Sequence, residues 1–237
     1  MNNLYKDKFV SVIIAAAGQG KRMNSKVNKQ YLKLCNKPVL AHTIDIFEKC
    51  SWVDEIIVVT HSNEIEYCKE NVIKVYGFKK VIRVIAGGST RQESVFNGLK
   101  SVDKRCSIVM IHDGARPFIR EEYILNSIDE AVKYKAVGIG VYVKDTIKVV
   151  DEDGYIVNTP DRKFLWAIQT PQTFDYDLLM KAYEKAIKEG FLGTDDTSLV
   201  ERINQKVKMI MGSYDNIKIT TPEDLYIGEA ILKSREN

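Results

Sequence analysis

The sequence predicts an α/β fold: a Rossmann-like, mostly parallel, twisted sheet with helices on both faces and a projecting β-hairpin arm. Three observations predict it. Short apolar runs recur along the chain, helical patterns with one apolar face lie between most of them, and one polar segment breaks the alternation. Buried runs that alternate with amphipathic helices are typical of a parallel sheet covered on both sides.

The expected strands are the apolar runs Val10–Ala15, Glu55–Val59, Val81–Ala86, Ser107–Ile111, Val137–Val143 and Val207–Met211. The expected helices between them are Val39–Cys50, Ile65–Tyr76, Arg91–Val102 and Glu121–Lys133. A last helix is expected from Pro222, which suits a first helical position. Thr221 is its candidate cap, and Glu223 and Asp224 lie near its positive end.

The segment Lys144–Arg162 breaks the alternation and predicts the arm. It has two β-branched stretches around Asp153-Gly154, a dipeptide typical of a two-residue hairpin turn. The segment is too short and polar to have its own core, so we expect it to project from the sheet and rest on a partner.

The composition limits the classes of protein that remain possible. The 237 residues are 45% hydrophobic, enough for a single domain spanning residues 1–237. The formal net charge of +3 does not suggest a nucleic-acid binder. Lys6 and Lys8 precede an apolar run as in a signal peptide, but Asp7 interrupts them, and the run continues into a glycine-rich loop. No stretch approaches the roughly 20 apolar residues of a membrane helix.

The cysteines favour a cytoplasmic location. Cys35, Cys50, Cys68 and Cys106 contain no CxxC pair, so we interpret them as reduced, buried thiols. The chain has three histidines and no HExxH motif, which argues against a zinc site.

Ligands of open parallel sheets bind beyond the carboxyl ends of the strands. Here that rule indicates the segments Ala15–Arg22, Gly87–Arg91 and His112–Arg116. The first is not a Walker A loop, because Gly18–Arg22 lacks its spacing and its Ser or Thr. Nor is it a dinucleotide fingerprint, because Met23 stands where glycine is required. What remains is either a small-residue turn that approaches a phosphate, followed by Arg22 and Lys29, or a tight turn with solvated charges.

The second segment belongs to the stretch GGSTRQESVFNGL. Gly87 and Gly88 allow close approach of the backbone, and Arg91 and Ser94 offer donors for the edge of a base. The alternative is an ordinary helix start, because Thr90 and Glu93 have the spacing of a capping box.

The third segment belongs to VMIHDGARPFI and places Asp113 at the end of a buried strand. A carboxylate there needs a cation or hydrogen bonds, and magnesium carrying a nucleotide would satisfy it. The alternative is an Asp113–Arg116 pair that caps the next helix. His112 is interpreted as structural.

A fourth motif, YDNIKITTPEDL, offers Asp215 as a second metal ligand and Lys218 as a phosphate holder, or simply a turn before a capped helix. Each motif is weak by itself. Because all four follow strands of one predicted sheet, together they indicate a nucleotidyltransferase. A nucleotide-binding protein without turnover is expected to lack one of the cations or metal ligands, but Arg22, Lys29, Asp113 and Lys218 are all present. Met23 argues against a dinucleotide-dependent oxidoreductase.

The motifs AAAGQGKRM, NKQYLKL, GGSTRQESV, HDGARPF, VKDTIK, TPDRKFLWAIQTPQTF, TDDTSLVE and DNIKITTPEDL occur in this order. Over Val10 to Ile231 the chain resembles the 2-C-methyl-D-erythritol 4-phosphate cytidylyltransferases of the non-mevalonate isoprenoid pathway. Gly114 departs from the commoner family form HDAARP, a loss of one methyl group that should spare the chemistry. The ribitol-5-phosphate cytidylyltransferases of cell-wall polymer synthesis share the QTPQ segment and remain the alternative.

The resemblance implies a site for CTP, a sugar-alcohol phosphate and Mg²⁺. Arg22 and Lys29 would stabilise the transition state. The nucleotide would be bound by Ala16, Ala17, Gly18, Gly88, Arg91, Ser94 and Asp113. Asp113 would also bind the metal, with Asp215 as a helper.

The acceptor site implied by the resemblance uses Lys218 together with Thr146 and Arg162 of the arm, and Arg162 and Lys218 count among the catalytic residues. Thr170 and Thr194 are further candidates for this site. In the family the arm, residues 144–162, embraces a second subunit, so a homodimer is expected with Thr146 and Arg162 acting across its interface.

Overall fold

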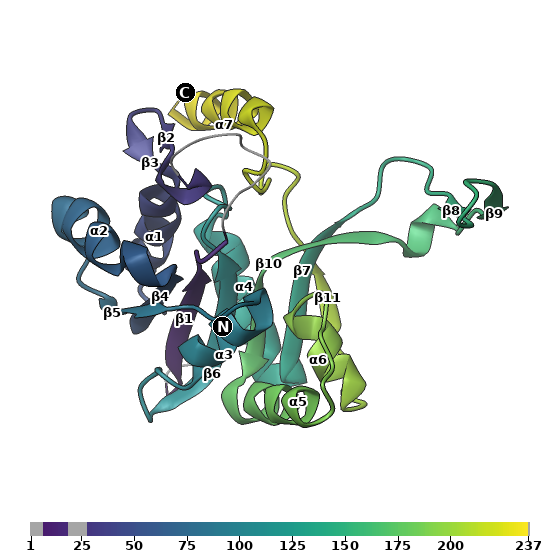
Figure 1. Cartoon of the computed structure of the whole chain (residues 1–237), viewed down its shortest axis with the longest axis horizontal. Coiled ribbons are helices and arrows are strands. Elements are labelled where there is room, and N and C mark those ends of the chain that lie inside the picture. The colour runs from purple at the N-terminus through teal and green to yellow at the C-terminus, as the bar shows by residue number, and fades with distance from the viewer. Residues whose placement is uncertain (1–6, 19–27, 237) are drawn as a thin grey trace.

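The computed structural model describes residues 7–18 and 28–236, and a seven-stranded sheet forms the centre of this part of the chain (Figure 1). Its strands are β1 (Phe9–Ala15), β4 (Glu55–Thr60), β5 (Val81–Ala86), β6 (Cys106–Asp113), β7 (Ala136–Tyr142), β10 (Trp166–Asp175) and β11 (Lys208–Met211). Their order is β11-β7-β10-β6-β1-β4-β5. Only β10 among them runs antiparallel to its neighbours, β6 and β7, which confirms the mostly parallel sheet.

Helices cover both faces of this sheet, as expected. One face packs against α1 (Val39–Lys49), α2 (Ile65–Cys68) with its π-helical continuation η4 (Lys69–Lys74), and α4 (Glu121–Tyr134). The other packs against α3 (Arg91–Leu99), α5 (Tyr176–Lys188) and α6 (Asp196–Arg202). Side chains alternate along a strand, so Val12 and Ile14 of β1 enter the first core while Ile13 enters the second.

Strand β10 and the helices α5 and α6 were not among the expected elements. β10 contains QTPQT, a polar stretch with a proline, and it nevertheless lies between two strands with Gln169, Thr170, Gln172 and Thr173 buried. Its polar groups have partners distant in the sequence. The Gln172 side chain, for example, accepts from the backbone of Asp196 and donates to Asp195. Buried polar groups that bond to residues distant in the sequence leave no sign in the local sequence pattern.

The arm projects away from the sheet at the ends of β7 and β10 (Figure 1). It carries the short strands β8 (Val149–Val150) and β9 (Ile156–Asn158). The expectation of a two-residue turn is wrong. The backbone N–H of Asp151 donates to the carbonyl of Tyr155, so the three residues between them, 152–154, form the loop. Gly154 closes this loop at φ +86°, a conformation that glycine adopts without strain.

A smaller apolar cluster lies beneath the last helix, α7 (Pro222–Glu236), which starts as expected. Leu34 and Phe118 are buried in it, next to the two-stranded ribbon β2 (Lys33–Leu34) and β3 (Lys37–Pro38). The turn of that ribbon holds Cys35, which is exposed, so the expectation that all four thiols are buried is wrong for Cys35. None of the helices in the described ranges is both long and apolar enough to cross a membrane.

Candidate active site

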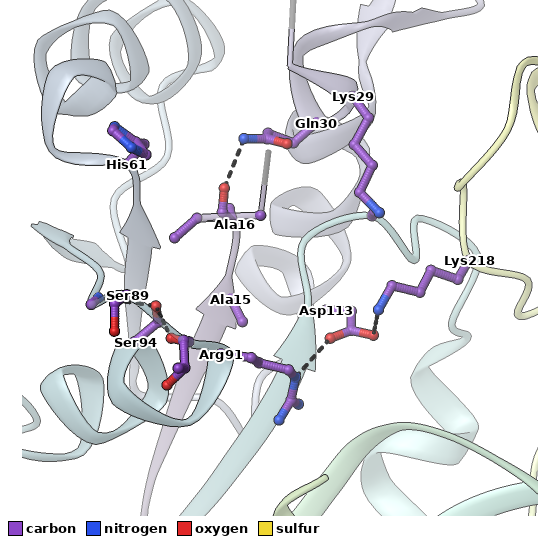
Figure 2. A pocket seen from close by; sticks show the side chains of 15 residues that line it. Ala15, Ala16, Lys29, Gln30, His61, Ser89, Arg91, Ser94, Asp113 and Lys218 are labelled. Carbon is purple, nitrogen blue, oxygen red and sulfur yellow. Dashed lines mark hydrogen bonds and ion pairs between the residues drawn. The ribbon is translucent and has the colours of Figure 1, made fainter. Parts of the chain in front are cut away.

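A cavity of about 500 Å³ opens at the carboxyl ends of β1, β5 and β6. Figure 2 shows side chains from all three strand ends, from the short helix η2 (Lys29–Tyr31) and from the loop before α7 converging on it. It is lined by Ala15, Ala16, Ala17, Gly18, Lys29, Gln30, His61, Gly88, Ser89, Thr90, Arg91, Ser94, Asp113, Ala115 and Lys218. The three segments selected by the strand-end rule therefore meet at one site.

The chain leaving β1 is held at Ala16 on both sides. Its backbone N–H donates to Val59 of β4 at 2.7 Å, and its carbonyl accepts from the Gln30 side chain at 2.7 Å. Lys29, next to Gln30, lines the cavity and extends toward it in Figure 2. Arg22, the other expected transition-state cation, lies outside the described residues.

The loop after β5 packs tightly against the start of α3. A Cβ atom on Gly87 would lie 2.6 Å from Ser94 Oγ and 2.7 Å from Ala17 Cβ, and one on Gly88 would lie 2.4 Å from Glu93 Cβ. Real side chains do not tolerate such distances, so glycine is required here by packing. The Gly88 N–H donates to Ser94 Oγ at 3.1 Å, which fixes this loop over the cavity.

The helix start predicted at Thr90 is confirmed. Thr90 Oγ1 accepts from the Glu93 N–H at 3.0 Å, and the Glu93 carboxylate accepts from the backbone and hydroxyl of Ser89. The N-terminal end of α3, at Thr90 and Arg91, thus lies beside the cavity, where the helix dipole favours negative charge.

Asp113 is the carboxylate of the cavity, and three cations surround it. Lys218 Nζ lies 2.7 Å from Oδ2, Arg116 Nε lies 3.6 Å from Oδ2, and Arg91 Nε lies 3.6 Å from Oδ1. Burial by itself would raise the pKa of Asp113, but Lys218 and Arg91 outweigh it and hold the pKa below its ordinary value. The carboxylate therefore stays ionised, and the site keeps an excess of positive charge.

Arg91 is also held from behind by a buried acid. Its Nη2 lies 2.7 Å from Oδ2 of Asp196, whose other oxygen accepts from the Tyr183 hydroxyl. Burial by itself lowers the pKa of Arg91, but Asp196 and Asp113 outweigh it and keep the guanidinium charged. Burial and Asp196 both raise the pKa of Tyr183, so its hydroxyl remains a donor.

His112 and Thr170 fix the backbone of Asp113. The Asp113 N–H donates to Thr170 Oγ1 at 3.0 Å, and that hydroxyl contacts His112 Nδ1 at 3.1 Å. His112 Nε2 lies 3.0 Å from the Arg116 carbonyl, which can only accept, so Nε2 carries the proton. Burial lowers the pKa of His112 to about 4. The structural role expected of His112 is confirmed.

Several expected site residues lie elsewhere. Asp215 pairs with Arg120 at 2.9 Å and with Arg235 at 3.8 Å and does not line the cavity. Thr194 lines a smaller hollow that shares Thr90 and Arg91 with the main cavity.

The two arm residues are also remote from the cavity within this chain. Thr146 and Arg162 are exposed on the arm, and Arg162 donates to the Lys144 carbonyl. A single chain therefore does not bring them to Asp113.

Two lining residues were missed in the sequence. His61 directly follows β4, so the strand-end rule could have found it had the rule been applied to that strand. Gln30 is buried at 2% exposure, and its only signal is its place beside Lys29. Among the described residues no group of three or more His, Cys, Asp or Glu side chains could hold a metal ion.

The family model of the 2-C-methyl-D-erythritol 4-phosphate cytidylyltransferases matches residues 10–234. The chain belongs to this family. A cytidylyltransferase of this name from Caldanaerobacter subterraneus is 54% identical over 224 residues, which are 94% of this chain and 99% of that protein. One from Clostridioides difficile is 54% identical over 222 residues, 94% of this chain and 93% of that protein.

Solved structures of the family agree with this fold. The 4-diphosphocytidyl-2C-methyl-D-erythritol synthase from Anaerococcus prevotii is 39% identical, with a TM-score of 0.87 over 98% of this chain and 100% of that one. The Thermus thermophilus cytidylyltransferase is 27% identical, with a TM-score of 0.76 over 95% and 99%. The chain is thus a nucleotidyltransferase, and its relatives support the methylerythritol phosphate branch rather than the ribitol phosphate alternative.

Proposed function

We propose that this chain joins CTP to 2-C-methyl-D-erythritol 4-phosphate, giving 4-diphosphocytidyl-2-C-methyl-D-erythritol and pyrophosphate in isoprenoid precursor synthesis. The observation that supports it best is the excess of cations over carboxylate around Asp113, at the strand ends that carry the sequence motifs of this chain. A cavity with such an excess suits a triphosphate beside a second phosphate.

In the proposed reaction an oxygen of the acceptor phosphate attacks the α-phosphorus of CTP as the bond to pyrophosphate breaks in line with it. The phosphate dianion is already a nucleophile. The chain must therefore bring anions together and stabilise the charge of the five-coordinate transition state. Lys29 lines the cavity, and we assign it this role together with Arg22.

The nucleotide site is proposed around the loops after β1 and β5. The backbone of Ala16, Ala17 and Gly18 would line the triphosphate. Gly88, Arg91 and Ser94 would recognise cytosine. All six residues line the cavity, and the packing of the glycine loop on α3 brings its backbone close to any occupant.

Magnesium is the proposed cofactor, and Asp113 is the residue that would hold it. The fit is good, because an ionised carboxylate at the edge of a cavity provides the hard oxygen that Mg²⁺ prefers, and Mg²⁺ is usually bound by one or two carboxylates plus substrate phosphates. When bound, it would neutralise phosphate charge. Asp215, paired with two arginines, is the weaker of the two proposed ligands.

For the acceptor phosphate we propose Lys218, with Thr146 and Arg162 supplied by the arm of a second copy. The arm exposes apolar side chains without a core of its own: Ile147, Val149, Val150, Tyr155, Ile156 and Val157, with exposed Phe164 just beyond it. Exposed apolar patches mark interfaces, which supports a homodimer. Thr170 fixes Asp113, and Thr194 lies behind Arg91, so both would act indirectly on this site.

We propose that residues 1–237 form one domain, with the arm, residues 144–162, as an insertion. The reaction is proposed to take place in the cytoplasm, which the free thiols of Cys35, Cys50, Cys68 and Cys106 support.

Pyrophosphate release tests the proposal directly. CTP and magnesium are supplied with methylerythritol phosphate or with ribitol 5-phosphate, in parallel. Turnover with the first acceptor alone is expected. Turnover with ribitol phosphate alone would move the chain to cell-wall polymer synthesis, and no turnover with either acceptor would contradict the proposed activity.

A further inference from the structure

Glu64 holds the segment that carries Lys29, although Glu64 does not line the cavity. It ends the short helix η3 (Ser62–Glu64), which follows β4. The Asn28 side-chain amide donates to its Oε1. The Gln30 amide donates more weakly to its Oε2, at 3.4 Å. One carboxylate thus bridges the residues on either side of Lys29.

The same carboxylate is tied to the sheet. Thr60, the last residue of β4, donates its hydroxyl to Glu64 Oε2 at 3.2 Å and contacts the Tyr31 hydroxyl at 3.0 Å. Because the Thr60 hydrogen points to Glu64, Tyr31 is the donor in the second contact. Tyr31 is buried, so the residues on both sides of Lys29 are connected through Glu64 to the end of β4, a strand of the main sheet.

We propose that Glu64 is a positioning residue, which directs Lys29 into the cavity by fixing its two neighbours. A lysine side chain is long and flexible, so the place of its ammonium group depends on how firmly its backbone is held. Figure 2 shows Gln30 bonded to Ala16 while Lys29 extends toward the region of Asp113 and Lys218. A shift of about 1 Å in such a group can cost about 100-fold in rate.

This inference rests on the proposed role of Lys29, and a double-mutant cycle separates the two. The variants are Lys29→Ala, Glu64→Ala and the combination, each assayed by pyrophosphate release with saturating CTP and acceptor. Glu64→Ala is expected to lower kcat about 10-fold without changing the KM of the acceptor. In the Lys29→Ala background it should have no further effect, because nothing remains to be positioned.

The matched control is Glu66→Ala, two residues away. Glu66 is exposed and pairs only with Lys69 among the described contacts, so its removal should leave kcat unchanged. Glu64→Gln should lie between wild type and Glu64→Ala, at about a 3-fold loss, because the amide keeps one acceptor oxygen for the three donors Asn28, Gln30 and Thr60. If Glu64→Ala does not fold, the cycle is repeated with Glu64→Gln.

The outcomes are distinguishable. The positioning role of Glu64 alone is overturned if Glu64→Ala lowers kcat equally in the wild-type and Lys29→Ala backgrounds. It is also overturned if Lys29→Ala is impaired but Glu64→Ala has the kcat of wild type. An unimpaired Lys29→Ala enzyme overturns the proposed role of Lys29 and, with it, this inference.

Discussion

The ammonium nitrogen of Lys218 lies 2.7 Å from Oδ2 of Asp113, joining the loop before α7 to the end of β6. Arg91 and Arg116 approach the same carboxylate at 3.6 Å. Asp113 therefore has two effects. It holds mutually repelling cations together, and it leaves them in excess, so an anionic substrate is favoured there.

Asp113→Asn removes the negative charge but keeps almost the same side-chain shape, so any loss reflects the charge of Asp113 and not its packing. The cations would then repel one another without compensation, and we expect the free energy of unfolding to fall by about 2 kcal/mol. kcat should fall by at least about 100-fold. Urea unfolding and steady-state kinetics measure the two losses.

The control for that change is Asp215→Asn. Asp215 pairs with Arg120 at the surface, so stability should change by less than about 0.5 kcal/mol. A large loss of kcat that extra magnesium restores would instead make Asp215 a metal ligand.

Arg91→Lys tests whether the nucleotide site depends on the two ion pairs of Arg91, with Asp113 and with Asp196. Only a guanidinium can contact Asp196 and Asp113 at once. The lysine variant should raise the KM of CTP about 10-fold while the KM of the acceptor stays the same. Arg105→Lys, an exposed arginine paired with Asp103, is the matched control. Equal increases in both KM values would remove Arg91 from the nucleotide site.

Much of this fold follows from local patterns. The apolar runs at β1, β4 and β5 and the cap at Thr90 are short-range signals that the tertiary structure preserves. The strand-end rule then located the cavity, because the carboxyl ends of parallel strands share one edge of the sheet.

What the patterns could not predict depends on contacts between distant residues. Arg91 and Asp196 are 105 positions apart, and nothing near Arg91 in the sequence indicates that a buried acid holds its guanidinium. Strand β10 can bury its polar stretch QTPQT because polar groups of other elements bond to it, and the local sequence does not show those partners. Cys35 is small and thiol-bearing, as buried cysteines are, but it occupies an exposed turn at φ 45°.

Gly87→Ala should damage the nucleotide site, because the new methyl group would lie 2.7 Å from Ala17 Cβ, which cannot rotate away. We expect the KM of CTP to rise about 10-fold. Gly114→Ala is the matched control. Its methyl group would lie 3.0 Å from Ala16 Cβ and 3.3 Å from both the Ala15 carbonyl oxygen and Leu40 Cδ1, so shifts of a few tenths of an ångström suffice and kcat should be unchanged. Similar damage from both substitutions would contradict the packing requirement at Gly87.

The thiols should differ in reactivity. Burial raises the pKa of Cys68 and of Cys106 to about 12, and it raises that of Cys50 as well. Since a pKa of 12 leaves roughly 1 thiol in 10,000 ionised at pH 8, these groups should react slowly with Ellman's reagent. Exposed Cys35 should give one fast-reacting thiol per native chain, and all four cysteines should react after unfolding. Cys35→Ser should abolish the fast phase, and its persistence would show that another cysteine is accessible.

Mixing two inactive variants tests whether the arm completes the site of a second copy. Arg162→Ala and Lys29→Ala should each be impaired, because each removes a cation from every site. In a heterodimer whose sites combine Lys29 of one chain with Arg162 of the other, one site carries both substitutions and the other carries neither. Random reassortment would therefore restore about one quarter of wild-type activity.

The arm must hold the two chains together for this recovery to occur. Ile156 and Val157 are each 60% exposed, so replacing both with Asp should leave a particle with the mass of a single chain in analytical ultracentrifugation and prevent recovery on mixing. Tyr226→Asp, at a side chain 77% exposed on α7, should change neither result. If the mixed variants stay inactive although copies with two different affinity tags co-purify as heterodimers, Arg162 acts within its own chain, and the arm has to fold back toward Asp113 instead of reaching the partner.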